Sequence, residues 1–266
     1  RALATPGTSR PWSVFRRGHV DRVRIEAGVR FWNEHDATLQ RVRETYGVPE
    51  DIVVAIIGIE TVFGRVTGTY RVLDALATLG FGTSGRIAFF QSELEEFLLL
   101  ARDGAFDPLV VRGSYAGAMG WPQFMPSSWR RHAQDFDGDG RIDLWGSVPD
   151  IVASVGNYFR ASGWQPGADV VLPATVIDAE RAAPLIAAGV RPGFTAAQVG
   201  AAGVTAQRAL RPDELAALLA FEGDAGTEHW LALPNFHVIT RYNRSQNYAL
   251  AVWQLAGEIR AARTGG

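Results

Sequence analysis

One apolar stretch that ends in an acid constrains this chain more than any other feature. Isoleucine, valine and phenylalanine recur at helical spacing between Pro49 and Gly64, which predicts a helix packed into a core. Pro49 followed by two acids is typical of a helix start, and Gly64 of a helix end. Glu60 then lies in the last turn of a mostly buried helix. There the helix dipole and the apolar surroundings disfavour its charged form, as a general acid requires. The alternative is a surface Glu that leaves the core at a helix end.

Composition excludes several classes of function. With 266 residues, 47% of them hydrophobic, the chain can bury a large core in one domain or in two to three lobes. A net charge of -2 gives no support for non-specific nucleic-acid binding. The absence of cysteine excludes disulfides, thiolate metal sites and cysteine nucleophiles. No apolar run approaches the length of a membrane span. The first residue is Arg1 rather than Met, so we expect a processed or trimmed form.

Periodicity predicts a mainly helical chain. We expect an extended lead-in over residues 1–18, short pieces broken by glycines over 65–88, and a strand-like segment over 236–243. Residues 164–232 predict a small, partly β lobe, in which Val170–Pro173, Ala174–Ile177 and Leu215–Phe221 fit either short strands or helical turns. Besides the Glu60 helix, apolar residues at helical spacing predict helices over residues 25–46, 89–101, 151–159 and 248–259.

An acidic segment matches the opening of an EF-hand loop. Oxygen ligands are expected at loop positions 1, 3, 5, 7 and 9, with glycine at position 6. Gly140 stands at position 6, and Gly146 stands where a bidentate Glu belongs at position 12. Asp150 could close the site from a longer loop. The expected ligands are Asp135, Asp137, Asp139, the carbonyl of Arg141, Asp143 and Asp150. We expect a structural Ca²⁺ here; the alternative is an acidic turn that stays hydrated.

No second catalytic group stands out beside Glu60. The five histidines lack metal-ligand spacing, and no G-x-S-x-G nucleophile motif occurs. An ordinary glycosidase needs two carboxylates flanking the scissile bond. Glu93, Glu95 and Glu96 are expected on a solvated helix face, and Asp74 in a structural role.

Several long motifs occur in one order along the chain. They are Gly58–Gly64, Arg71–Leu79, Gly113–Gly120, Gln123–Ser128, the acidic loop and Ile239–Asn243. In this combination the chain resembles the B type of the lytic murein transglycosylases, bacterial enzymes with a lysozyme-like catalytic core. The resemblance covers about residues 15–260.

The resemblance implies a reaction that needs only one carboxylate. It implies that Glu60 protonates the oxygen of the β-1,4 bond between N-acetylmuramic acid and N-acetylglucosamine in peptidoglycan. The same residue then acts as base on the sugar's C6 hydroxyl, which forms a 1,6-anhydro ring without water. The implied partners are peptidoglycan strands and other cell-wall enzymes, with no catalytic cofactor. The implied setting is a monomer in the periplasm.

The resemblance also implies residues that contact the glycan. For each aromatic among them the alternative is core packing. They are Arg86, Ser114, Met119, Gln123, Phe124, Tyr158, Tyr242, Asn243 and Tyr248. The chain departs from the family pattern in three places. Gly85 and Phe89 replace an Arg and a Tyr, the acidic loop closes one step late at Asp150, and no N-terminal cysteine offers a lipid anchor.

We therefore expect an α+β, mainly α protein with a lysozyme-like core and an EF-hand-like loop. The predicted parts are a helical lobe over 1–47 packing with 244–266, a core over 48–163 with its metal loop over 135–150, a small lobe over 164–232, and a return segment with a final helix over 233–266. Two rival functions remain open at this point. A hydrolytic muramidase would need a second carboxylate or a positioned water, and a non-catalytic glycan-binding protein would not need Glu60 in an apolar frame.

Overall fold

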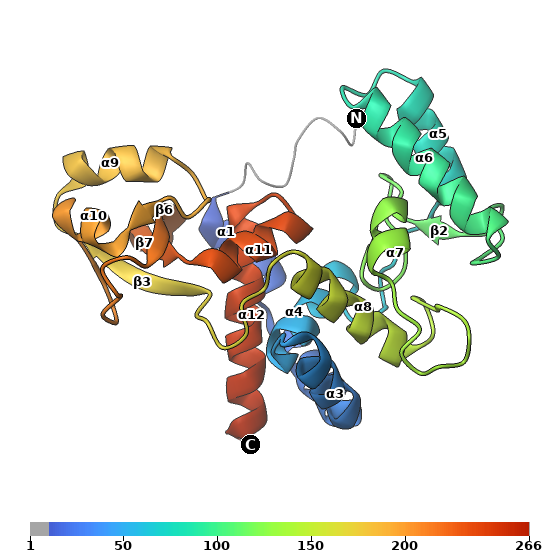
Figure 1. The fold of residues 1–266 in the computed structure, drawn as a ribbon, viewed down its shortest axis with the longest axis horizontal. Helices are drawn as coiled ribbons and strands as arrows, with labels where there is room; N and C mark the ends of the chain where they lie inside the picture. Colours follow the sequence, from blue (N-terminus) through green and yellow to red (C-terminus); the bar gives the residue numbers. More distant parts are fainter. Residues whose placement is uncertain (1–10, 266) are drawn as a thin grey trace. The chain divides into compact units, whose positions relative to one another are not determined.

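The structure of the protein, a computed structural model, describes residues 11–265. The described chain forms two compact units (Figure 1). Unit 1 comprises residues 11–25 and 162–265, and unit 2 comprises residues 26–161. One boundary falls inside α2 (Arg22–Glu34). Among the described residues, no helix is both long and apolar enough to cross a membrane.

Unit 2 is helical apart from one short two-stranded ribbon. The ribbon pairs Tyr70 with Gly113 and Arg71 with Arg112. Helices α5 and α6 lie side by side (Figure 1). The elements of unit 2 are α3 (Asp36–Tyr46), α4 (Glu50–Thr61), β1 (Tyr70–Arg71), α5 (Val72–Phe81), α6 (Ile87–Arg102), β2 (Arg112–Gly113), α7 (Pro126–His132) and α8 (Val148–Ala161).

Helix α4 is the centre of the core of unit 2. Every residue in it except Glu50 and Glu60 is buried, because aliphatic side chains cover all of its faces. The helix packs against α3 and α8. It ends at Thr61, since Val62 takes a left-handed conformation with φ of 50°. The expected buried helix carrying Glu60 in its last turn is thus confirmed.

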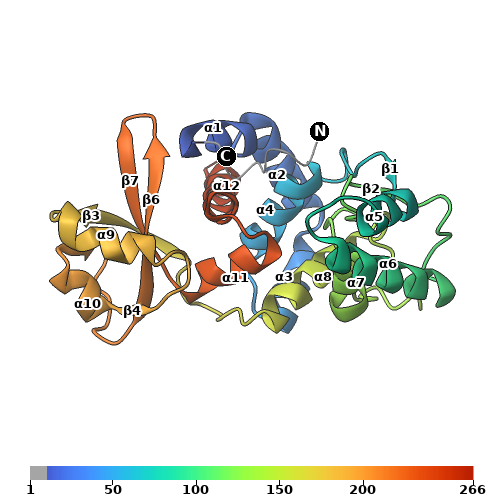
Figure 2. The ribbon, with the colours of Figure 1, turned by 90° about the horizontal axis from the view of Figure 1, so that it is seen from above.

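Unit 1 combines a five-stranded antiparallel sheet with helices. The sheet order is β4-β6-β7-β3-β5, and Figure 2 shows the β6–β7 hairpin clearly. The elements are α1 (Trp12–His19), β3 (Val171–Val176), α9 (Ala179–Ala187), β4 (Phe194–Thr195), α10 (Ala196–Ala201), β5 (Val204–Ala206), β6 (Leu215–Gly223), β7 (Gly226–Ala232), α11 (Pro234–Tyr242) and α12 (Gln246–Thr264).

Strand β6 is buried on both faces. Ala216 and Leu218 belong to an apolar cluster with residues of α9 and α10. On the alternate positions, Phe221 packs edge-to-face against Trp12 of α1, with ring centroids 5.5 Å apart. Side chains along a strand point to opposite faces in turn. Helices therefore cover this sheet from two sides, which explains why β6 is almost continuously apolar.

Four sequence-based expectations were wrong. Helix α1 lies inside the supposed extended lead-in, and residues 25–46 form two helices because His35, with φ of -121° and ψ of 22°, interrupts them. Helix α5 lies within the segment expected to be broken by glycines. A Cβ on Gly80 would lie 3.3 Å from Gln91 of α6, so this glycine permits close helix packing. Residues 236–243 are mostly helical, because Pro234 at the first turn starts α11.

The predicted helices at 89–101, 151–159 and 248–259 correspond to α6, α8 and α12, and the partly β lobe contains the five-stranded sheet. The division into units differs from the predicted lobes. Residues 26–47 belong to unit 2 rather than with the C-terminal helix, and residues 164–232 share unit 1 with α11 and α12.

Candidate active site and acidic loop

Glu60 is the only residue in the second half of α4 that is not buried. Its neighbour Thr61 is fully buried and joins α4 to the loop 113–124. The Thr61 hydroxyl lies 3.1 Å from the carbonyl oxygen of Trp121, to which it donates, and it accepts from the N–H of Gly64 at 3.1 Å. The backbone that carries Glu60 is therefore fixed on both sides of the helix end.

Gln123 makes a second link between the same two segments. Its amide nitrogen donates to the carbonyl of Thr67 at 3.1 Å and to that of Gly120 at 2.9 Å. Both amide hydrogens are thereby used, and the amide oxygen is left as the acceptor for another group. The loop is closed by paired backbone hydrogen bonds between Met119 and Phe124, at 2.8 and 3.0 Å.

Three non-glycine residues of the described chain have a left-handed backbone, and all three belong to these segments. They are Val62, Phe63 and Gln123, with φ between 50° and 57°. Such conformations cost about 1–3 kcal/mol each and cluster at functional sites. Their residue types did not predict this conformation. The only signal was the position of Val62 and Phe63, two and three residues after the acid.

Ser114 lies in the expected loop and is half-buried. Its hydroxyl oxygen accepts from the N–H groups of Ala116 and Ala118, at 3.2 and 3.0 Å. A hydroxyl has one hydrogen to donate in addition to its acceptor sites. Ser114 therefore shapes the turn and still offers one donor.

Three of the residues expected to contact glycan are core residues instead. Met119, Phe124 and Tyr248 are 0%, 2% and 3% exposed. Side chains that present so little surface favour the alternative, core packing, over the predicted roles as groove wall or stacking residues.

The other expected contacts have accessible surface. Arg86 precedes α6 and places its guanidinium 3.9 Å from the ring centre of Phe89. Tyr158 of α8 is half-buried, with its ring 4.9 Å from that of His132 and 5.8 Å from that of Phe124. In unit 1, Tyr242 is half-buried at the end of α11 and Asn243 is exposed.

Glu93 was expected to be solvated, but it is 4% exposed. Its two carboxylate oxygens accept from the backbone N–H of Ser127 at 2.9 Å and from the Ser127 hydroxyl at 2.7 Å. Glu93 thus holds the first turn of α7, just after the Gln123 loop. Nothing local in the sequence pairs these residues. Asp74, in contrast, is exposed and binds Arg71 through two contacts of 2.8 Å.

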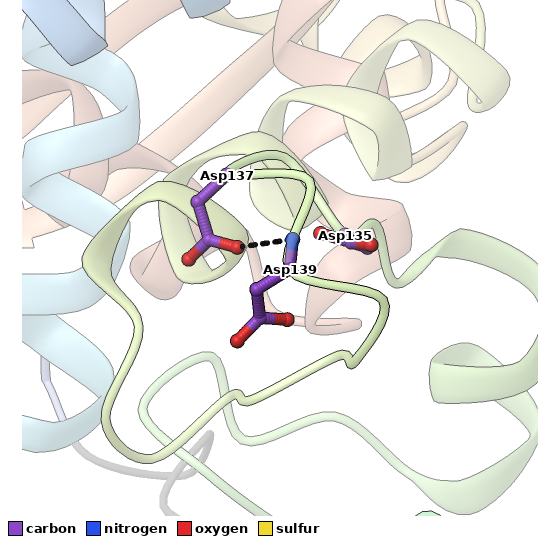
Figure 3. Close-up of side chains that lie close together, drawn as sticks. All are labelled: Asp135, Asp137 and Asp139. Atoms are coloured by element: carbon purple, nitrogen blue, oxygen red, sulfur yellow. Dashed lines mark hydrogen bonds between the residues drawn. The ribbon is translucent and has the colours of Figure 1, made fainter.

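Three carboxylates of the acidic loop come together as expected. One oxygen from each of Asp135, Asp137 and Asp139 lies within 4.8 Å of the other two (Figure 3). Gly138 and Gly140 supply the left-handed turns, with φ of 78° and 86°. Within this loop Asp135 accepts from Gly138 and Gly140, at 2.7 and 2.9 Å. The donor set consists of hard oxygens, the ligands that Ca²⁺ prefers.

The later acids of the loop have other partners. Asp150 is buried, and its two oxygens accept from the N–H groups of Phe136 and Asp143, at 2.7 and 2.9 Å. Burial raises the pKa of the Asp150 carboxyl, against the effect of these two donors. Asp143 accepts from the N–H groups of Trp145 and Gly146. Ser147, which the sequence analysis missed, donates to Asp137 at 2.5 Å and lowers the pKa of that carboxyl.

Comparison with known proteins defines the class. The family described as Transglycosylase SLT domain matches residues 2–257. Membrane-bound lytic murein transglycosylase B of Escherichia coli (strain K12) is 46% identical over 97% of this chain and 70% of its own length. The crystal structure of the soluble lytic transglycosylase SltB1 from Pseudomonas aeruginosa is 50% identical, with a TM-score of 0.92, over 100% of this chain and 88% of that one. The Escherichia coli lytic transglycosylase Slt35 in complex with calcium is 45% identical, with a TM-score of 0.86, over 95% and 79%.

The buried helix ending in Glu60, the linked loop and these likenesses define an enzyme of cell-wall glycan cleavage. The chain belongs to the family of Transglycosylase SLT domain proteins. Its activity is that of a lytic transglycosylase acting on bacterial peptidoglycan, as the resemblance implied.

Proposed function

We propose that Glu60 alone performs the acid and the base step of this reaction, at the β-1,4 bond between N-acetylmuramic acid and N-acetylglucosamine. The observation that carries the proposal is the position of Glu60. It is the accessible carboxylate at the end of a buried helix, next to the strained segments that Thr61 and Gln123 tie together. Preorganised groups of this kind contribute to catalysis because they need not rearrange during the reaction.

The proposed steps balance without water. The Glu60 carboxyl gives its proton to the glycosidic oxygen, and the bond from that oxygen to C1 of the muramoyl sugar breaks. The C6 hydroxyl of the same sugar then attacks C1 and gives its proton to the Glu60 carboxylate. A C6–O–C1 bridge forms and Glu60 regains its starting state. The attack is intramolecular, and tethered reactants gain a high effective concentration.

We propose unit 2 as the catalytic part, with a lysozyme-like core, and six further residues as glycan contacts. Ser114 offers a hydroxyl donor, Gln123 an amide oxygen, Arg86 a cation and Tyr158 an aromatic face. Asn243, together with Tyr242, is assigned by its matching motif. Met119, Phe124 and Tyr248 act only as buried support. We place the enzyme in the periplasm, where its substrate lies, and propose that it acts as a monomer.

Product analysis tests the proposal. Digestion of peptidoglycan should release muropeptides that end in 1,6-anhydro rings, one water lighter than hydrolysis products. These ends should resist borohydride and carry no label after digestion in heavy-oxygen water. Reducible, labelled ends would instead show a hydrolytic muramidase. In that case a second carboxylate or a positioned water would have to be sought.

We further propose that the acidic loop binds a structural Ca²⁺ through Asp135, Asp137, Asp139 and the carbonyl of Arg141. The clustered carboxylates support this, because their mutual repulsion falls when a cation binds. Asp143 and Asp150 would join the ligand set only by exchanging backbone hydrogen bonds for the ion, so we assign them to holding the loop.

A bound ion stabilises the native state by RT ln(1 + [L]/Kd), about 2.7 kcal/mol at a hundredfold excess over Kd. Ca²⁺ should therefore raise the melting temperature, and Asp137→Ala or Asp139→Ala should remove that response. Asp213→Ala, an exposed acid of unit 1, is the matched control. Equal melting curves in Ca²⁺ and in chelator would refute the site.

A further inference from the structure

A cavity of about 560 Å³ lies in unit 1, where α1, β6 and the start of α12 meet. This volume is within the range of small-molecule sites. Nothing in the reaction proposed above uses it. Its base is rigid, since Trp12 and Phe221 are each 2% exposed and pack edge-to-face.

The rim of the cavity carries two charges of opposite sign. Arg244 and Glu222 both line it and are exposed. Neither forms a salt bridge within residues 11–265, whereas other exposed arginines of unit 1 do, such as Arg208 with Asp169 and Arg17 with Asp224. The two charges also do not neutralise each other. A ligand with both an anionic and a cationic group would therefore meet two available partners.

On the side of the cavity that carries Arg244, the start of a helix adds to the positive potential. Gln246 and Asn247 line the cavity as the first residues of α12, a helix of 19 residues that Ser245 caps by accepting from Tyr248 at 3.3 Å. The N–H groups in a first helical turn have no acceptor within the helix, and the helix dipole is positive there. Together with Arg244 this side favours a carboxylate, while Glu222 favours an amine.

The cavity also adjoins the glycan contacts along the chain. Arg244 directly follows Tyr242 and Asn243, which belong to the same unit. In peptidoglycan, a short peptide hangs from each muramoyl sugar, and it carries carboxylates and a free amine. A ligand held at Asn243 through its sugar would present that peptide next to Arg244.

We propose, on the basis of the function above, that this cavity binds the stem peptide of peptidoglycan. Arg244 and the start of α12 hold a stem carboxylate, and Glu222 holds the stem amine. The site then adds to substrate affinity without touching the reacting atoms, and it makes the enzyme prefer strands that still carry their peptides.

The test measures the activity of four proteins on each of two substrates. The substrates are glycan strands with stems and the same strands after an amidase has removed the stems. The proteins are the wild type, Arg244→Gln, Glu222→Gln and the control Arg181→Gln, an exposed arginine on α9. The readout is kcat/KM for anhydro-end formation. For stem-bearing strands Arg244→Gln should lower it about tenfold, as expected for losing a charged hydrogen bond, and Glu222→Gln should lower it by less. On stripped strands all four proteins should agree.

A second experiment measures binding of the stem peptide without catalysis. A synthetic stem tripeptide, L-alanyl-γ-D-glutamyl-meso-diaminopimelate, is titrated into the wild type, with tryptophan fluorescence and nuclear magnetic resonance as readouts. Binding should weaken with salt, since exposed charges are screened, and it should weaken in Arg244→Gln. Equal losses on both substrates would assign the cavity to the glycan and overturn the proposal, as would an absence of tripeptide binding. A wild type that forms no anhydro ends at all would instead refute the proposed function.

Discussion

Two loop regions of unit 2 use left-handed backbone, but only one of them does so with residues other than glycine. In the acidic loop the left-handed positions are Gly138 and Gly140, and a Cβ on either would meet nothing within 4 Å. Beside Glu60 they include Val62, Phe63 and Gln123, for which this conformation is strained. The acidic loop therefore has a shape that its own sequence favours. The segments at Glu60 have a shape that the surrounding fold must impose.

The imposed shape has identifiable restraints. Thr61 and Gln123 supply the hydrogen bonds that join the end of α4 to loop 113–124, and Gly64 lies against the ring of Trp121. Strain is retained where the surroundings over-determine a conformation, and such places are commonly functional. We therefore expect the strained segments to serve the chemistry and the relaxed loop to serve stability.

The largest expected effect separates these two roles. Glu60→Gln keeps the shape of the side chain but cannot exchange a proton, so activity should fall by at least about 10²–10⁴-fold. Melting temperature and glycan binding should stay close to those of the wild type. Asp139→Asn in the acidic loop is the matched change of acid to amide, and in excess Ca²⁺ it should retain activity within a few-fold. Anhydro-end formation measured on both purified variants decides the matter, and comparable losses would break the distinction between the loops.

The second prediction compares two glycines that have a similar backbone conformation. Gly64 and Gly140 have φ of 79° and 86°, so alanine is strained by about 1 kcal/mol at either. At Gly64 a Cβ would also lie 2.2 Å from a ring carbon of Trp121, and at Gly140 it would meet open space. Overpacking adds about 1–3 kcal/mol.

Urea unfolding in chelator should therefore show a loss of about 1 kcal/mol for Gly140→Ala and about 2–4 kcal/mol for Gly64→Ala. Gly64→Ala should also lose activity, because Trp121 must move with its loop. If the two variants lost the same stability, the tight contact of Gly64 with Trp121 would have no energetic weight.

The contrast between the loops also explains what sequence could predict. The acidic loop and the buried helix of Glu60 are local patterns, because glycine and aspartate spacing or apolar periodicity determines each. The clamp between Glu93 and Ser127 joins residues 34 positions apart, and no local pattern contains it. The left-handed Val62 runs against its own preference, so propensity predicts the opposite.

Two expectations were made without knowledge of the surrounding structure. The alternation of apolar residues near Phe236 wrongly predicted a strand, although Pro234 marked a helix start. Met119 and Tyr248 match motif positions of the family, yet only the folded chain shows how little surface they present. Motif position indicates proximity to a site, and burial decides whether a side chain can touch the ligand.

The smallest effect concerns His132, at the end of α7 between the two loops in sequence. Its Nδ1 is buried without a hydrogen-bond partner among the described residues, and its ring meets that of Tyr158 edge-on at 4.9 Å. Burial, helped by neighbouring Arg131, lowers the pKa of this imidazole. A proton is therefore bound more readily in the unfolded chain, where the pKa is about 6.5. It follows that stability is fully present above about pH 6.5 and is lost as the pH falls below that value.

His132→Gln should remove this dependence. The free energy of unfolding of the wild type should fall relative to the variant between pH 7.5 and pH 5.5, by less than about 1 kcal/mol because a half-buried ring keeps part of its hydration. The comparison is made in saturating Ca²⁺, so that titration of the acidic loop contributes equally to both proteins. Parallel stability curves for the two proteins would mean that His132 does not titrate with folding. Since Tyr158 is a proposed glycan contact, a matching loss of substrate affinity at low pH in the wild type alone would link this imidazole to the site.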